Sequence, residues 1–452
     1  MTLGRPLDAE ERRVSQRNYG RFCLVNGASY MCLGENVLVL FAAQLGAPNA
    51  VVSLLGAMLY VGYVMVPLGV RRTAKRGAAV SQADFWVARN IAALFTASAA
   101  AVAAFSPPAS WAMLILGAFV FYGCRDAGCV LATPLLGDIS TQEEAPDLIG
   151  SAQAKFNVSA VVVLAAITAA TTRWSGRGAL AAIIVVGAFL GVASSTFLRG
   201  VRETGKVMES AREPLVPGMR EAVGNRDLRL LSVAWGLANC GIMLLIPISM
   251  LALKRGCGFS DSRALVCSCV QFLSGCFFSV ASGPLCRRFG PRRVLLATTA
   301  AMPFVPAFWF FAPSGGTAAL AGGIVLFAWL GALNVLVGNV PQSYFLLACP
   351  DKRKQVAASV AVCLAYGAAA GVFSSVLGSW LVSGSASWSS GLGAAFAGSL
   401  GPFRLYFLLV LPVIAAAIVS AFRLRTLVYA YKEAHGESGL RTAIALGHHR
   451  KH

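Results

Sequence analysis

The chain has 452 residues, of which 57% are hydrophobic and only 13% are charged, and its mean hydropathy is +0.68. Soluble domains carry about 25% charged residues, so this composition excludes a soluble protein and indicates a polytopic membrane protein. The net charge of +19 does not indicate nucleic-acid binding, because the basic residues lie in short loops between apolar runs, where the positive-inside rule puts them.

The chain begins with a polar and charged segment, residues 1–21, and its part 8–21 is expected to form an amphipathic helix on the membrane surface. The first apolar run is too long for a cleavable signal, so we expect a signal anchor. Twelve apolar runs follow, each near or above the roughly 20 residues that a membrane-spanning helix needs. They lie at about 22–43, 50–70, 88–106, 110–136, 156–172, 178–198, 229–253, 262–286, 294–312, 317–347, 355–381 and 402–422.

Lysine and arginine are distributed unequally between the two sides of these twelve runs. With the amino terminus inside, 31 of them lie on the inner side and 6 on the outer side. The positive-inside rule then predicts that both termini are cytoplasmic. The expected location is the cytoplasmic (inner) membrane of a bacterium.

A polar stretch at 199–228 divides the runs into six and six, and is expected to be a cytoplasmic linker with short surface helices. Residues 1–198 would form one half, and 229–452 the other, with a polar tail from Arg423. Pro67 and Pro284 end the second and eighth runs in similar short sequences. A repeated set of six spans is a known transporter architecture, so the predicted fold is all-α, with two pseudo-symmetric six-helix bundles.

A charged pair, Arg125 and Asp126, lies at the centre of the fourth run, on the same side of the helix as Tyr122. A charge at bilayer depth costs about 3 kcal/mol or more, so this side is expected to face a cavity. An internal ion pair that only fixes packing is the alternative.

In the first run, Glu35 and Asn36 lie beside Gly34, where the helix is expected to be irregular. The alternative for Glu35 is a purely structural role.

The second half carries no charge in the interior of its runs; its charged residues there stand within three residues of a run's start. Its polar positions include Asn239, Gln271 and Asn334. These side chains are candidates to line a cavity that binds a solute by hydrogen bonds. The alternative, hydrogen bonds between helices, is common in membrane proteins.

The loop between the eighth and ninth runs reads GPLCRRFGPRR and resembles the cytoplasmic motif G-x-L-x-D-R-x-G-R-R of the major facilitator superfamily. Arg287 stands where that motif has Asp, so the usual carboxylate contact is not expected. Gly283 and Gly290 are expected to permit a tight turn, and the arginines to attract headgroups and helix C-termini. The resemblance implies a gating role for the matching residues, and topogenic charge is the alternative. These candidates are Gly283, Arg288, Gly290, Arg292 and Arg293.

The resemblance implies a secondary active transporter that moves a small solute by alternating access, with proton coupling as one form. A passive facilitator and a non-transporting sensor stay open. An enzyme is not expected, because every histidine lies in the tail after Arg423. No cofactor or metal is expected, since the twelve cysteines lack zinc spacing. The expected partners are the solute, protons or another ion, and lipids, for a monomer that binds no nucleic acid.

The charges suggest how coupling would work. Glu35, Arg125 and Asp126 sum to −1, and an unpaired buried carboxylate tends to be neutralised. Direct pairing of Arg125 with its neighbour Asp126 is awkward, because adjacent residues point about 100° apart on a helix. We therefore expect Arg125 to pair with Glu35 in one state, and the carboxylate released in the other to bind a proton or cation.

Overall fold

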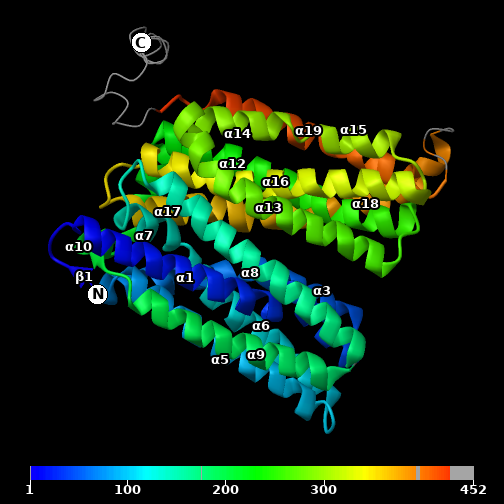
Figure 1. Ribbon diagram of the computed structural model, residues 1–452, viewed down its shortest axis with the longest axis horizontal. Helices are drawn as coiled ribbons and strands as arrows, with labels where there is room; N and C mark the ends of the chain where they lie inside the picture. The colour runs from blue at the N-terminus through cyan, green and yellow to red at the C-terminus, as the bar shows by residue number, and fades with distance from the viewer. Residues whose placement is uncertain (1, 175, 393–395, 397, 428–452) are drawn as a thin grey trace. The chain divides into compact units, whose positions relative to one another are not determined.

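The computed structural model describes residues 2–174, 176–392, 396 and 398–427, and it is almost entirely helical (Figure 1). At a few positions inside these helices only the backbone is described, and Glu35 and Asn36 are two of them. The long helices follow the apolar runs, because in lipid a helix satisfies every backbone polar group within its own segment.

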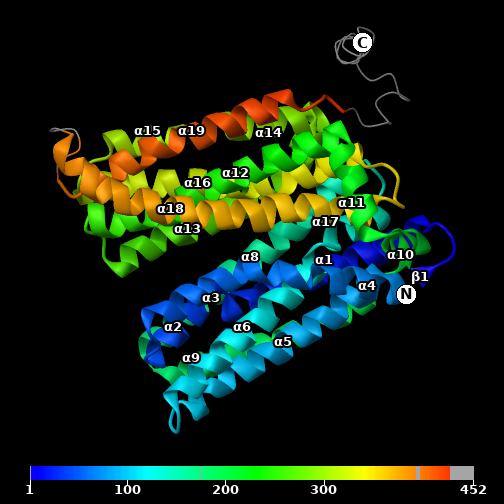
Figure 2. The same cartoon turned by 180° about the vertical axis from the view of Figure 1, so that it is seen from behind.

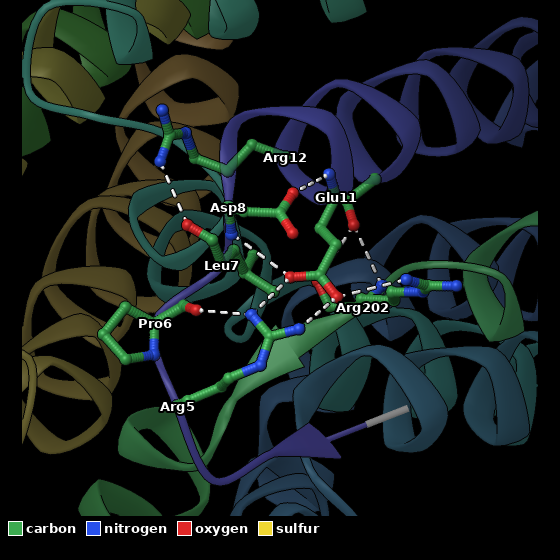
Figure 3. Close-up of polar contacts among 8 residues, drawn as sticks. Arg5, Pro6, Leu7, Asp8, Glu11, Arg12 and Arg202 are labelled. Atoms are coloured by element: carbon green, nitrogen blue, oxygen red, sulfur yellow. Dashed lines mark hydrogen bonds and ion pairs between the residues drawn. The ribbon is translucent and has the colours of Figure 1, made fainter.

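The first helix, α1 (Ala9–Leu33), already begins in the charged amino-terminal segment. Asp8 and Glu11 form a capping box, and Arg5 and Arg202 bind the Glu11 carboxylate at 2.9 and 3.2 Å (Figure 3). The prediction of a separate surface helix over 8–21 is therefore wrong, because this cap starts the membrane helix itself. The expected irregularity is confirmed: Gly34 is extended (ψ 168°) and separates α1 from α2 (Glu35–Gln44).

The remaining helices of the first half form a bundle in which α1 packs on α9, α9 on α5, and α5 on α6 (Figure 2). Their bounds are α3 Asn49–Val61, the 3-10 helix η1 Gly62–Met65, α4 Val66–Arg76, α5 Ala78–Val102, α6 Pro107–Cys129, α7 Ala132–Asp138, α8 Ala145–Arg173 and α9 Arg177–Arg199.

The linker forms the short helices α10 (Gly205–Arg212) and α11 (Leu215–Gly224), as predicted. It also contains a strand that was not predicted. This strand, β2 (Glu203–Thr204), pairs in parallel with β1 (Thr2–Leu3). The sequence pattern did not show it, because a two-residue strand has no periodicity.

In the second half, α13 packs on α16 and α12 on α19. The bounds are α12 Arg226–Leu251, the π-helix η2 Ala252–Gly256, α13 Asp261–Phe289, α14 Pro291–Ala300, α15 Phe304–Phe311, α16 Gly316–Ala348, α17 Gln355–Cys363, the π-helix η3 Leu364–Ala369, α18 Ala370–Trp388, the 3-10 helix η4 Ser389–Gly391 and α19 Gly401–Arg423.

Within the described residues, eleven helical runs are long and apolar enough to cross a membrane, against twelve predicted. The difference lies in the second predicted span, 50–70. There the helix tightens to the 3-10 segment η1 between α3 and α4, so no single long helix is present. Three glycines explain why this region stays close to α6. A Cβ on Gly62 or Gly69 would meet the backbone of α6, and one on Gly123 would meet Met65.

The chain forms two compact units. The first comprises Met1–Ser140, Ser151–Glu221 and Asp351–Leu364, and the second comprises Thr141–Gly150, Ala222–Pro350 and Ala365–His452. The core of the first unit is built from small and aliphatic side chains of α2, α5, α6 and α9 around Phe41 and Phe121. In the second unit, Trp309 stacks on Phe407 at 5.6 Å and donates a hydrogen bond to Ser249.

Candidate functional site

The charged pair of α6 is joined directly. Arg125 Nη1 lies 3.3 Å from Asp126 Oδ1. The expectation that adjacent positions would pair poorly is wrong, because the long arginine stem reaches around the helix where a short side chain does not. The two partners differ in exposure: 28% of the Arg125 side chain is accessible, against 2% for Asp126. The Arg125 side chain is therefore partly accessible, whereas the Asp126 side chain is enclosed by protein.

The second carboxylate oxygen of Asp126 is buried without a hydrogen-bond partner among the described residues. It faces Gly62 of η1, where a Cβ would lie only 2.7 Å from Oδ2. An unsatisfied buried acceptor costs about 1–3 kcal/mol of folding free energy, so an oxygen without a partner is uncommon between packed helices. A proton on this oxygen would remove the charge of the carboxylate.

A second buried arginine, Arg89 of α5, was not predicted. Its side chain is 1% exposed, and its guanidinium lies over the rings of Trp86 and Phe121 at 4.8 and 5.2 Å. Asn26 Oδ1 accepts hydrogen bonds from Arg89 Nη2 (2.9 Å) and Trp86 Nε1 (2.7 Å). The positive charge is thus held by a neutral amide and two aromatic faces.

Arg89 is one of the 31 basic residues predicted to lie on the inner side, because it stands at the edge of the apolar run 88–106. The structure begins the helix at Ala78, so Arg89 lies three turns inside it. One signal was available: no glycine or proline interrupts residues 78–102, so the helix had no reason to start later.

One face of α1 organises these groups. Phe22, Asn26 and Tyr30 are four residues apart and therefore line one side of the helix. Phe22 contacts Trp86 edge to face, and Tyr30 lies under the guanidinium of Arg125 at 5.9 Å. We call Asn26, Tyr30, Arg89, Arg125 and Asp126 the polar cluster. It joins α1, α5 and α6 within the first unit.

A double-mutant cycle tests the Asn26–Arg89 contact. Asn26→Leu is expected to destabilise the protein by about 3 kcal/mol, because it leaves a buried charge and an indole N–H without an acceptor. Arg89→Met should cost less, since it removes the charge itself. The double variant should be more stable than Asn26→Leu alone, as read from thermal midpoints in detergent. Additive losses would show that the contact carries no coupling energy.

Of the other predicted residues of the first half, the side chain of Tyr122 is described and those of Glu35 and Asn36 are not. Tyr122 is 1% exposed in the hydrophobic core and contacts the ring of Phe121. It does not share the accessibility of Arg125. The side chains of Glu35 and Asn36 lie outside the described residues, so a pair between Glu35 and Arg125 stays a prediction.

In the second unit, Asn239 makes a hydrogen bond between helices, donating from Nδ2 to the carbonyl oxygen of Tyr366 at 2.8 Å. The Tyr366 ring stacks on Trp235 with centroids 3.7 Å apart. Gln271 is half-buried, and its backbone oxygen packs against Gly331, whereas Asn334 is exposed on α16. The structure therefore ties Asn239 to an aromatic pair but does not join it to Gln271 or Asn334 by any described contact.

The basic loop is a turn at one glycine rather than two. Gly290 separates α13 from α14 with φ +82°, as its predicted role requires. Gly283 lies inside α13, so the prediction that it permits a turn is wrong. A Cβ there would collide with Asp147. The absence of a side chain at Gly283 therefore lets the first turn of α8 pack closely against α13. Arg287 binds the same Asp147 at 2.9 Å, so a carboxylate contact exists with the charges exchanged.

The remaining arginines of the loop differ in their contacts. Arg292 donates to Thr426 Oγ1 (2.8 Å) and to the carbonyl oxygen of Phe422 (2.7 Å), near the end of α19. This confirms the expected attraction to a helix C-terminus. Arg288 is exposed over the ring of Phe289 at 5.2 Å, and Arg293 is exposed. Arg292 thus joins α14 to the end of α19.

The described residues contain no group of His, Cys, Asp and Glu side chains that could hold a metal ion. The described cysteines are free thiols, and most of them are buried. The chemistry that the described site offers is therefore ionic pairing, hydrogen bonding and aromatic contact.

Comparison with known proteins places the chain in a family. The model of the Major Facilitator Superfamily matches residues 23–374. No curated protein sequence matches the chain. Among solved structures, the chain is similar to the E. coli fucose:proton symporter FucP, with a TM-score of 0.67 and 11% identity over 91% of this chain and 98% of that one. It is also similar to the proton:xylose symporter XylE, with a TM-score of 0.63 and 12% identity over 92% and 95%. At these identities the likeness shows the fold, that of the twelve-helix transporters.

Proposed function

We propose that this chain, which belongs to the major facilitator superfamily, moves a small solute across the cytoplasmic membrane by alternating access and couples that movement to protons. The superfamily is one of membrane transporters rather than enzymes. The solute would bind near mid-membrane, where such repeat architectures hold their substrates. The resemblance in fold to two proton symporters supports the proposal without naming the solute.

The observation that carries the coupling proposal is the Arg125–Asp126 pair. Asp126 is 2% exposed and has one oxygen without a partner among the described residues, while Arg125 is partly open. When Arg125 turns toward a solute, Asp126 loses its counter-charge and takes up a proton, because a lone buried carboxylate is costly. The pair of Arg125 with Glu35 in one state, with the carboxylate released in the other state binding the proton, stays a second form of this proposal.

A passive facilitator is the second candidate, and Arg89 favours it. With Arg89 included, the charges Arg89, Arg125, Glu35 and Asp126 sum to zero. The excess negative charge that would require a proton is then absent. Coupling therefore depends on how the charges pair in each state and not on their number.

Proteoliposomes test the function. Purified protein is first screened for thermal stabilisation by amino acids, sugars, organic acids and cationic drugs, and the best compound is then used in flux assays. A transporter gives protein-dependent flux, and coupling to protons makes an imposed pH gradient drive accumulation. Flux that only equilibrates the solute supports the facilitator. A compound that binds tightly without any flux supports a sensor.

The topology follows from the same proposal. Both termini are expected in the cytoplasm, because basic residues concentrate on that side. Reporter fusions at Leu424, after α19, should be active inside the cell, and fusions at Gly315, between α15 and α16, should be active outside. A cytoplasmic signal from Gly315 would overturn the topology and the six-plus-six arrangement together.

A further inference from the structure

A buried acidic junction lies where the linker meets the bundle of the first unit. Glu203 of β2 is 0% exposed, and its carboxylate accepts hydrogen bonds from the amides of Ala78 (2.9 Å) and Ala79 (3.1 Å), the first residues of α5. Glu203 thus caps a helix far away in the sequence. Gly77, with φ +82°, leaves no room for a side chain beside this carboxylate.

The next residue of the strand is held in the same way. Asp138, at the end of α7, is 4% exposed and accepts hydrogen bonds from the hydroxyl (2.6 Å) and the amide of Thr204. Two consecutive residues of the linker are therefore fixed by two buried carboxylates. Strand β1 pairs with the same two residues, so the amino-terminal segment covers the junction.

The charges around the junction do not balance. Lys352 Nζ lies 3.3 Å from Asp138 Oδ1 and is the cation that pairs with Asp138 in the described contacts. Neighbouring cations are engaged elsewhere: Arg202 and Arg5 bind Glu11, and Arg76 binds Asp84. The amino terminus at Met1 lies outside the described residues. Among the described ion pairs, Asp138 thus has a lysine partner, whereas Glu203 is held by backbone amides.

We propose that Glu203 and Asp138 form a proton-sensitive latch, which holds the linker on the ends of α5 and α7 and loosens as the pH rises. Protonation of Glu203 removes the repulsion between the two carboxylates and the cost of a buried charge. Deprotonation restores the repulsion and the cost of the buried charge. When the linker opens, water reaches the carboxylates and reduces both of these costs. The latch does not depend on the solute or on coupling.

The direction of the effect follows from proton uptake. Burial, with a smaller contribution from the charge of Asp138, raises the pKa of Glu203 from its ordinary 4.5 to about 7, against the opposing effect of the two amides. The latched state therefore holds a proton that the open state releases. Its stabilisation is complete below pH 4.5 and is lost as the pH rises to 7. The opening equilibrium should grow about tenfold per pH unit in that window and level off above it.

Hydrogen exchange on the full-length protein, tagged only at the carboxyl terminus, measures this opening. Peptides covering residues 203–212 are followed at pH 5, 6, 7 and 8, and rates are corrected for intrinsic exchange. In the wild type, opening should be roughly 40-fold greater at pH 7 than at pH 5, because at pH 7 the latched carboxylate is already half deprotonated. Glu203→Gln should remove this dependence, and Asp138→Asn should shift the levelling-off to lower pH.

Glu213→Gln is the matched control, because Glu213 is exposed in the same linker and should keep the wild-type profile. A flat wild-type profile, or a Glu203→Gln profile that keeps the wild-type slope, overturns the latch. A profile that Glu213→Gln abolishes overturns it as well. No transport is measured, so this outcome is separate from that of the proposed function.

Discussion

Replacing Asp126 with Asn is expected to abolish accumulation driven by a pH gradient while leaving solute exchange at equal concentrations. The amide cannot take up or release a proton, yet it keeps the size of the side chain beside Gly62. Arg125→Ala should abolish both activities if the guanidinium also binds the solute. The measurements are initial rates of uptake and of exchange in proteoliposomes at several pH values, with matched protein abundance.

The control for this result is Glu143→Gln, a change at an exposed carboxylate outside the polar cluster, which should behave as the wild type. Uphill uptake by Asp126→Asn at the wild-type rate, with unchanged pH dependence, would show that Asp126 is structural. The passive facilitator would then be excluded as well, because accumulation would persist through another group.

Replacing Gly69 with Ala is expected to destabilise the protein by about 1–3 kcal/mol, the usual cost of overpacking. Its added methyl group would collide with the backbone carbonyl of Ala127 on α6, and a backbone cannot move aside as a flexible side chain can. The same contact face carries Gly62 and Asp126, so the polar cluster should be disturbed too.

The matched control is Gly178→Ala in α9, where an added Cβ has no neighbour within 4 Å. Thermal midpoints in detergent and the abundance of folded protein compare the two variants. Equal midpoints for Gly69→Ala and Gly178→Ala would mean that α4 and α6 are not in close contact in the membrane.

The sequence by itself determined the features that depend on local composition. Apolar runs of about 20 residues must form helices in lipid, so the membrane class and most spans were predictable. The resemblance of the loop at Gly283–Arg293 was enough to indicate the superfamily, which the family match over residues 23–374 confirms. The turn at Gly290 was also predictable, because a backbone position that needs a positive φ favours glycine, and this preference is local.

Only the tertiary structure decided which charges are buried and what they contact. Arg89 lies at the edge of an apolar run, and nothing local distinguishes a buried arginine there from a loop arginine; its partner Asn26 is 63 residues away. Glu203 looks like an ordinary linker glutamate, yet it caps a helix 125 residues earlier in the chain. The pairing of Arg125 with Asp126 depends on the path of a flexible stem. Burial and pairing of charges are set by contacts between distant segments, so a linear pattern of residue types does not contain them.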